Sequence, residues 1–210
     1  MTQKFVVHAS HPQLRLLRQA AELLRAGAVL ALPTDACYVL ACSLDDSDSV
    51  LRMRAMRNLD DKHLLTLMCR DLSELASYAQ IDNWQFRFLK EWTPGAYTFI
   101  LPATRKVPRK IWHPSRKTIG MRVPGTALID ALLAELAGPL LCTSLILPGE
   151  DEPLQEADDI VRALNRRIEL VIDAGGQGLQ PTTVIDMTGG EPMVQRIGVG
   201  DVRGMTHVAS

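Results

Sequence analysis

The chain has 210 residues, of which 47% are hydrophobic and 22% are charged, and its formal net charge is −1. This composition can bury a full hydrophobic core, and no linker divides the chain, so we expect one domain over residues 1–210 with its core at about 10–200. The first eight residues carry no signal peptide, and no later stretch is apolar enough to span a membrane. We therefore expect a cytoplasmic protein without a membrane partner.

Apolar runs that alternate with helical patterns indicate the elements of the first half of the chain. Ser10 is the expected cap of the first helix, and Gly27 ends that helix. Pro33 then separates two short strands. Strands are expected at 5–7, 29–32, 64–69 and 97–101, and a further strand ends at 42. Helices are expected at 11–24 and 50–56, and two more begin near residues 71 and 82.

The second half continues the alternation of strands and helices. Thr126 is a typical helix N-cap, and the joins near Pro33 and Gly189 are as short as hairpins. Short joins favour antiparallel neighbours, so the fold class that we expect is α/β, a twisted open mixed sheet with flanking helices. The expected strands are 118–123, 139–144, 170–173, 182–186 and 192–196, and the expected helices are 127–136 and about 156–166.

Cysteines and histidines give no sign of a metal site. The cysteines are scattered in apolar settings without a Cys-x-x-Cys pair, so we expect reduced core thiols and neither zinc nor disulfides. Four histidines lack a second ligand at metal-binding spacing. The residues in question are Cys37, Cys42, Cys69, Cys142, His8, His11, His113 and His207.

The stretch around Pro33, Thr34 and Asp35 organises the rest of the chain. Proline ends a buried strand and delivers two polar side chains to its tip, which is where α/β folds place ligands. A plain turn, in which both side chains bond local amides, is the alternative.

Hydroxyl and charged groups stand at four strand ends where a structural sheet does not need them. Hydroxyls orient small polar ligands, and an arginine holds a carboxylate with a bidentate fork, so we expect one shared cavity. Each hydroxyl taken alone could simply bond its neighbouring backbone. The set consists of Thr34, Arg122, Thr143, Ser144, Thr182 and Thr183.

Positive charge gathers in one part of the chain. Between Trp92 and Ile129 there is no acidic residue, whereas 150–159 is acidic. A basic surface of this kind favours an anionic partner such as RNA, although a solvated basic loop is an equal alternative. The candidate RNA-binding residues are Arg105, Lys106, Arg109, Lys110, Arg116 and Lys117.

These motifs together resemble the YrdC-like family, and most closely its YciO branch. The resemblance covers nearly the whole chain and rests on the segments 33–38, 120–124, 143–144, 181–186 and 196–198. It implies a threonylcarbamoyl-AMP synthase, which joins threonine, bicarbonate and ATP, releases pyrophosphate and supplies tRNA modification. The family is also a double-stranded-RNA-binding fold, so RNA binding without synthase chemistry is the alternative function.

The resemblance implies roles for particular residues. Threonine contacts fall on Thr34, Arg122, Thr143, Thr182 and His63. Nucleotide contacts fall on Arg57, Thr118, Ser144 and Arg196, with Arg57 and Lys62 as the catalytic cations. Mg²⁺ is expected to bridge the phosphates of ATP rather than sit in a protein cage.

Two positions depart from the family pattern. The Lys-x-Arg motif reads Ala55-Met56-Arg57, and the Ser-x-Asn motif reads Ser144-Leu145-Ile146. Alanine cannot stabilise charge on a leaving pyrophosphate, and isoleucine offers no side-chain hydrogen bond. We therefore expect the threonine pocket to be better kept than the machinery for ATP activation.

A glycine-rich stretch at 175–178 invites comparison with a phosphate-binding loop. It lacks the following Lys-Ser or Lys-Thr and leads to Pro181 instead of a helix. We reject a phosphate-loop function for it.

Overall fold

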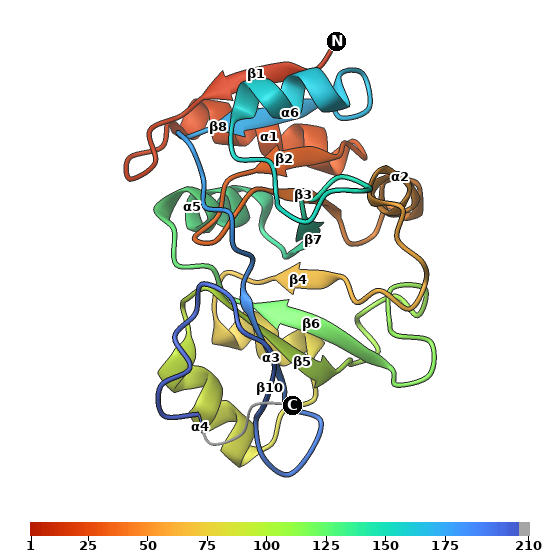
Figure 1. Ribbon diagram of the computed structural model, residues 1–210, viewed down its shortest axis with the longest axis vertical. Coiled ribbons are helices and arrows are strands. Elements are labelled where there is room, and N and C mark those ends of the chain that lie inside the picture. The colour runs from red at the N-terminus through yellow and green to blue at the C-terminus, as the bar shows by residue number, and fades with distance from the viewer. Residues whose placement is uncertain (206–210) are drawn as a thin grey trace.

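The computed structural model describes residues 1–205 (Figure 1). Its helices are α1 Leu14–Arg25, α2 Ser47–Arg57, α3 Leu72–Tyr78, α4 Asn83–Trp92, α5 Ala127–Leu136 and α6 Ala157–Leu164. Its strands are β1 Gln3–Val6, β2 Leu30–Leu32, β3 Val39–Ser43, β4 Thr66–Met68, β5 Tyr97–Pro102, β6 Thr118–Arg122, β7 Leu140–Ser144, β8 Leu170–Asp173, β9 Thr183–Asp186 and β10 Met193–Arg196. No helix among these residues is long and apolar enough to cross a membrane.

All the strands form one mixed sheet in the order β1-β8-β2-β3-β7-β4-β6-β5-β9-β10. Strand β8 runs parallel to β1 and β2, and the pairs β4/β6 and β5/β9 are also parallel. The remaining neighbours are antiparallel, including the hairpin pairs β2/β3 and β9/β10. The mixed sheet expected from the short joins near Pro33 and Gly189 is confirmed.

Two hydrophobic cores lie on opposite faces of the sheet because side chains alternate along each strand. On β2, Ala31 belongs to the core shared with α2, α3, α4 and α6, whereas Leu30 and Leu32 belong to the core shared with α1 and α5. Figure 1 shows α1 over the end of the sheet that holds β1, β8 and β2, and α4 at the end that holds β5 and β10.

Helices α1 and α5 leave part of their face of the sheet uncovered. In the β4, β6, β5 and β9 half, the inward residues Leu67, Phe99 and Met121 pack into the first core. Their neighbours Thr66 and Thr98 point to the opposite face, where they line a cavity and do not pack against a helix. This uncovered half, which we call the concave face, is where polar groups have room for a ligand.

Side-chain caps start most of the helices. Asp46 accepts from the Asp48 amide, and Asp82 forms a capping box with Gln85 at the start of α4. Thr126 accepts from the Ile129 amide at 3.3 Å, as predicted. Such caps satisfy amides that a helix leaves free at its start.

The predicted cap of the first helix is wrong. Helix α1 begins at Leu14 after Gln13, and Ser10 lies in the preceding turn. The His8 Nδ1 atom accepts from the amides of Ser10 and His11, so a histidine organises that turn. The helix consequently starts after Pro12 instead of at His11.

Candidate functional site

A cavity of about 200 Å³ opens on the concave face. A smaller hollow of about 20 Å³ shares five of its residues and reaches deeper, to Cys37 and Arg122. The five shared residues are Thr66, Thr98, Thr143, Ser144 and Thr182. Strand ends and mid-strand positions from β4, β5, β7 and β9 therefore bring five hydroxyls to one place.

Threonine hydroxyls bond one another across this wall. The Oγ1 atoms of Thr98 and Thr182 are 2.7 Å apart and share a hydrogen bond. The carbonyl of Thr182 accepts from Nη2 of Arg196 at 3.0 Å, which ties the arginine to the cavity. Such fixed hydroxyls and cations are groups that orient a polar ligand.

Arg122 is held by the aspartate of the Pro-Thr-Asp turn. Its side chain is 3% exposed, and its Nη2 atom donates to the Asp35 carboxylate. The same carboxylate accepts from the Gly125 amide at 2.8 Å. The Nε atom of Arg122 is buried and has no hydrogen-bond partner, so the guanidinium keeps a free donor at the floor of the cavity.

Three arginines place positive charge around the Cys37 thiol. Burial raises the pKa of Cys37, while a hydrogen bond from Ser144 and the charges of Arg122, Arg196 and Arg57 oppose the rise. The net pKa stays above the ordinary value, so the thiol is protonated at neutral pH. The floor of the site is thus a neutral thiol within a positive field that suits an anionic ligand.

Arg57 lies where α2 ends and reaches the segment after β7. Its Nη1 atom donates to the carbonyl of Ile146, and its Nε atom is buried without a partner. Burial lowers the pKa of Arg57, and also that of Arg196, because it penalises the charged form. Of the two departures from the family pattern, Ile146 therefore contacts this guanidinium through its carbonyl, whereas Ala55 is exposed on α2.

His63 lies on a loop at the rim of the cavity. The carboxylate of Asp60 accepts from the amides of Lys62 and His63 at 3.0 and 2.9 Å, and Arg54 donates to the carbonyls of Asp60 and His63. Partial desolvation, followed by the charges of Arg57 and Arg54, lowers the pKa of His63. The imidazole is accordingly neutral at pH 7, able both to donate and to accept.

The structure brings together most of the predicted site residues. His63, Thr143, Ser144, Thr182 and Arg196 line the cavity, and Arg122 lines its floor. Arg57 stands close enough to influence both Cys37 and His63. The predicted convergence of strand-end groups is therefore observed for these residues.

Five predicted residues do not line the cavity, namely Thr34, Arg57, Lys62, Thr118 and Thr183. Thr34 donates to the Cys37 carbonyl at 2.8 Å and accepts from the Ala36 amide, so it fixes the turn. Thr118 is buried in β6, and its hydroxyl has no hydrogen-bond partner. Lys62 is exposed on the loop before His63. The prediction that Thr34 lines the shared cavity is wrong, because its hydroxyl forms hydrogen bonds within the turn.

Sequence reasoning missed part of the wall. Thr66 begins β4, whereas Thr98 and Gly120 lie within β5 and β6, and all three line the cavity. A Cβ atom at position 120 would lie 2.8 Å from Thr66 Oγ1, so glycine keeps the wall open. Alternation identifies which residues share a face, but only the packing of helices decides which face stays open.

The basic segment, which connects β5 to β6 in the sequence, lines a separate groove. Val107 and Ile111 are buried anchors, and the indole of Trp112 donates to the Val107 carbonyl at 2.8 Å. A groove of about 610 Å³ has no carboxylate in its lining. Its cations are Arg105, Arg109, Arg116 and Lys117, and none of them forms an ion pair with a described residue.

Two members of the predicted RNA-binding set lie elsewhere. The Lys106 ammonium lies 5.8 Å from the centre of the Tyr78 ring. Lys110 lines a different cavity, beside α2. The basic segment therefore divides its charge between two surfaces, which a linear count of cations could not reveal.

Within residues 1–205, no group of three or more histidine, cysteine, aspartate or glutamate side chains could hold a metal ion. The cysteines are free thiols in the protein interior. The cation-rich cavity is thus built from hydroxyls and guanidiniums.

The molecule is thus an α/β protein with a half-covered mixed sheet, and hydroxyls and arginines gather on the open face of that sheet. Residues 22–198 match the Sua5/YciO/YrdC family, which carries the description telomere recombination. The chain is 47% identical to YciO of Escherichia coli over 97% of its own length and 98% of that protein. A Haemophilus influenzae protein is 43% identical over 95% of this chain and 97% of its own. The chain belongs to the Sua5/YciO/YrdC family, as its motifs predicted.

Solved structures agree with this assignment. The crystal structure of E. coli YciO matches with a TM-score of 0.95 and covers 98% of this chain and 100% of that one. The structure of Pyrococcus abyssi Sua5, described as P. abyssi Sua5 complexed with L-threonine, has a TM-score of 0.90 at 24% identity. It covers 99% of this chain and 63% of that one, and it shows a shared fold.

Proposed function

We propose that this protein binds L-threonine and ATP on its concave face and forms threonylcarbamoyl-AMP from them and bicarbonate. The observation that carries the proposal is the convergence of Arg122, Arg196 and five hydroxyls on one cavity. Family membership and the threonine-bound Sua5 neighbour, which has the same fold, support this substrate class.

Arg122 is suited to the carboxylate of threonine. Its guanidinium is anchored by Asp35, so its free Nε donor is already oriented before a ligand arrives. Thr143 and Thr182 supply hydroxyls for the amine and side chain of the amino acid. A preoriented donor loses little entropy on binding, which favours a small polar substrate.

Arg57, Arg196 and Ser144 are the groups that would meet the nucleotide. The amine of threonine would combine with bicarbonate and lose water to give a carbamate. An oxygen of the carbamate would then attack the α-phosphorus of ATP as the bond from that phosphorus to pyrophosphate breaks. Guanidiniums stabilise the charge that moves to the leaving group. Mg²⁺ would travel with the phosphates of ATP, and the chain's own contribution is to position the substrates.

The two family departures should make this activity weak. The side chains of Ala55 and Ile146 offer no charge and no hydrogen bond at the positions where the family pattern has lysine and asparagine. Arg57 itself donates to the Ile146 carbonyl, so part of its hydrogen-bonding capacity is used before ATP binds. We therefore infer a divergent YciO-type member with reduced ATP turnover.

Threonine-dependent release of pyrophosphate from ATP and bicarbonate tests the proposal. We expect slow release by the parent chain that needs threonine, and a loss of about 10²-fold in Arg196→Ala. Arg87→Ala is the matched control, because Arg87 is exposed on α4 and leaves the rate unchanged. The proposal would be contradicted if pyrophosphate release did not depend on threonine, or if both variants lost the same fraction of the rate.

RNA binding is a second candidate, favoured by the acid-free basic groove. Four unpaired cations can neutralise phosphates along a duplex, and such contacts read shape rather than sequence. Each phosphate contact adds a little less than one unit to the slope of log affinity against log salt.

Duplex RNA titrated at several salt concentrations tests this candidate. Arg105→Ser with Arg116→Ser and Lys117→Ser should weaken binding and reduce the salt slope by about 2–3. Lys90→Ser with Arg87→Ser, two exposed cations of α4, serves as the control. An unchanged slope in the first variant would exclude the groove from RNA binding.

A further inference from the structure

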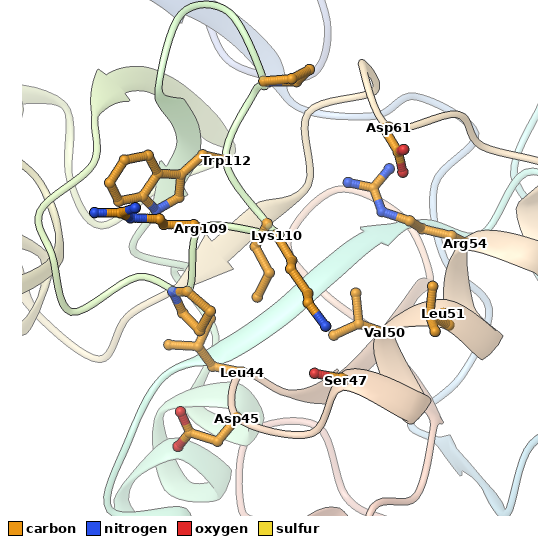
Figure 2. A pocket seen from close by; sticks show the side chains of 13 residues that line it. Leu44, Asp45, Ser47, Val50, Leu51, Arg54, Asp61, Arg109, Lys110 and Trp112 are labelled. Carbon is orange, nitrogen blue, oxygen red and sulfur yellow. The ribbon is translucent and has the colours of Figure 1, made fainter.

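A second cavity, of about 430 Å³, lies between α2 and the basic segment (Figure 2). It shares no lining residue with the cavity on the concave face. Its volume falls in the range that holds small molecules, about 300–1,000 Å³. Nothing in the proposed synthase chemistry uses it.

The floor of this cavity is apolar. Leu44, Val50 and Ile111 are buried beneath it, and Trp112 forms part of the wall with its indole fixed by a hydrogen bond to Val107. Leu51, at the rim, is 63% exposed although it is a large aliphatic residue. An apolar or aromatic body seated here would cover surface that water now covers.

Cations reach into the cavity from the basic segment. Figure 2 shows the Lys110 ammonium extended toward Ser47 and Val50, whereas the Arg109 guanidinium points away from Lys110. Neither Arg109 nor Lys110 forms an ion pair with a described residue, although both are lining groups.

The two carboxylates of the lining lie at opposite ends of the cavity. Asp61 lies beside Arg54 at one end, and its charge stabilises the protonated form of that guanidinium. Asp45 lies at the other end, beyond Leu44. Three cations and two carboxylates line the cavity, so its net charge is positive, and the Lys110 ammonium is the cation that lies beside Val50 on the apolar floor.

We propose that this cavity is a binding site for a small aromatic anion, with the ring on the apolar floor and the anionic group at the Lys110 ammonium. A charge-assisted hydrogen bond from Lys110 would fix the anion, and contact with the apolar floor would hold the ring. Carboxylate and phosphate share this chemistry. A nucleic-acid backbone is better matched by the neighbouring groove, because the lining of that groove contains no carboxylate.

The fluorescent probe 1-anilinonaphthalene-8-sulfonate, which joins aromatic rings to an anion, measures binding directly. Lys110→Glu and, separately, Leu51→Glu should weaken binding at least about tenfold, because each puts a negative charge at the site. Both residues are exposed, so the fold is retained.

Two control variants separate this cavity from the others. Arg116→Ser with Lys117→Ser alters only the basic groove, and Arg196→Ser alters only the concave face. Both should bind the probe within twofold of the parent chain. Failure of the parent to bind, or a loss confined to a control variant, overturns the proposal.

Displacement of the probe identifies the anionic group. Benzoate and phenyl phosphate are titrated against the probe-bound parent chain. Displacement by one of them, at least about tenfold better than by acetate or inorganic phosphate, supports the site and names its chemistry. If neither aromatic anion displaces the probe, the proposed site is overturned.

Discussion

The Asp35 carboxylate supports the site by joining the turn after Pro33 to the end of β6, which is distant in sequence. It bonds the guanidinium of Arg122 on β6 and the amide of Gly125 after that strand. A buried arginine without its partner is an uncompensated charge in a low dielectric. The central turn therefore supplies structure as much as ligand contacts.

We expect Asp35→Ala to lower the free energy of unfolding by about 3 kcal/mol or more, because it leaves Arg122 unpaired. Urea denaturation measures the loss. Glu152→Ala, at an exposed carboxylate, should change stability by no more than about 0.5 kcal/mol. Similar small changes in both variants would show that the Asp35 pair contributes little.

His63 reports the charge of its surroundings. Its pKa is lowered by desolvation and then by Arg57, so Arg57→Gln should raise it. Because the folded pKa lies below the unfolded value of about 6.5, the unfolded chain binds more protons between the two values. The stability due to His63 is thus present above about pH 6.5 and is lost as pH falls toward the folded pKa.

NMR titration of the His63 ring measures that pKa in the parent chain and in Arg57→Gln. Arg105→Gln, in the basic groove, should leave it unchanged. A His63 pKa that falls or stays constant in Arg57→Gln would mean that Arg57 does not reach the rim of the cavity.

At the scale of elements, α2 and the loop after it act as one support. Arg54 is 6% exposed and donates to two carbonyls of the loop that carries His63. Asn58, in the left-handed region at φ 52°, turns the chain from the helix into that loop. One buried guanidinium thus connects the helix with the rim of the site.

We expect Arg54→Met, which keeps the apolar stem, to cost about 1.5–3 kcal/mol because hydrogen bonds from a charged group are lost. Hydrogen exchange of the Lys62 and His63 amides should become faster. Arg87→Met, at an exposed arginine of α4, is the control with unchanged exchange. Protected loop amides in Arg54→Met would contradict this supporting role.

Most elements could be predicted because apolar periodicity and caps act locally. The strands around Pro33 and the helix after Thr126 follow from nearest neighbours in sequence. The start of α1 could not be predicted from Ser10, because the side chain of His8 takes the amides of that turn. Local competition between two possible turn partners decided that boundary.

At the scale of the whole molecule, the site exists because α1 and α5 cover only half of one sheet face. Strand-end residues such as Thr143 could be predicted as candidates from position alone. Thr98 could not, because a threonine within a strand faces a cavity only where tertiary packing leaves the sheet uncovered. The division of the basic segment between two cavities depends on packing in the same way.

Restoring the family residues tests how distant segments cooperate. Arg57 joins α2, the helix that also carries Ala55, to Ile146 after β7. Ala55→Lys with Ile146→Asn should raise ATP turnover, since one preorganised charge contributes about 2.7–4 kcal/mol to barrier lowering. Threonine-dependent pyrophosphate release measures the gain, with Ala55→Gln as a neutral control. No gain would place the limiting defect elsewhere.

The central claim is that the concave face binds L-threonine together with ATP, and amide chemical-shift mapping tests it most directly. Saturating the isotope-labelled protein with L-threonine and ATP should move the amides of Thr66, Gly120 and Thr182, and Arg196→Ala should weaken the response. D-threonine should have a smaller effect, because an oriented carboxylate and hydroxyl discriminate between stereoisomers. Unmoved concave-face amides at saturating ligand, or shifts confined to the cavity beside Trp112, would contradict the account.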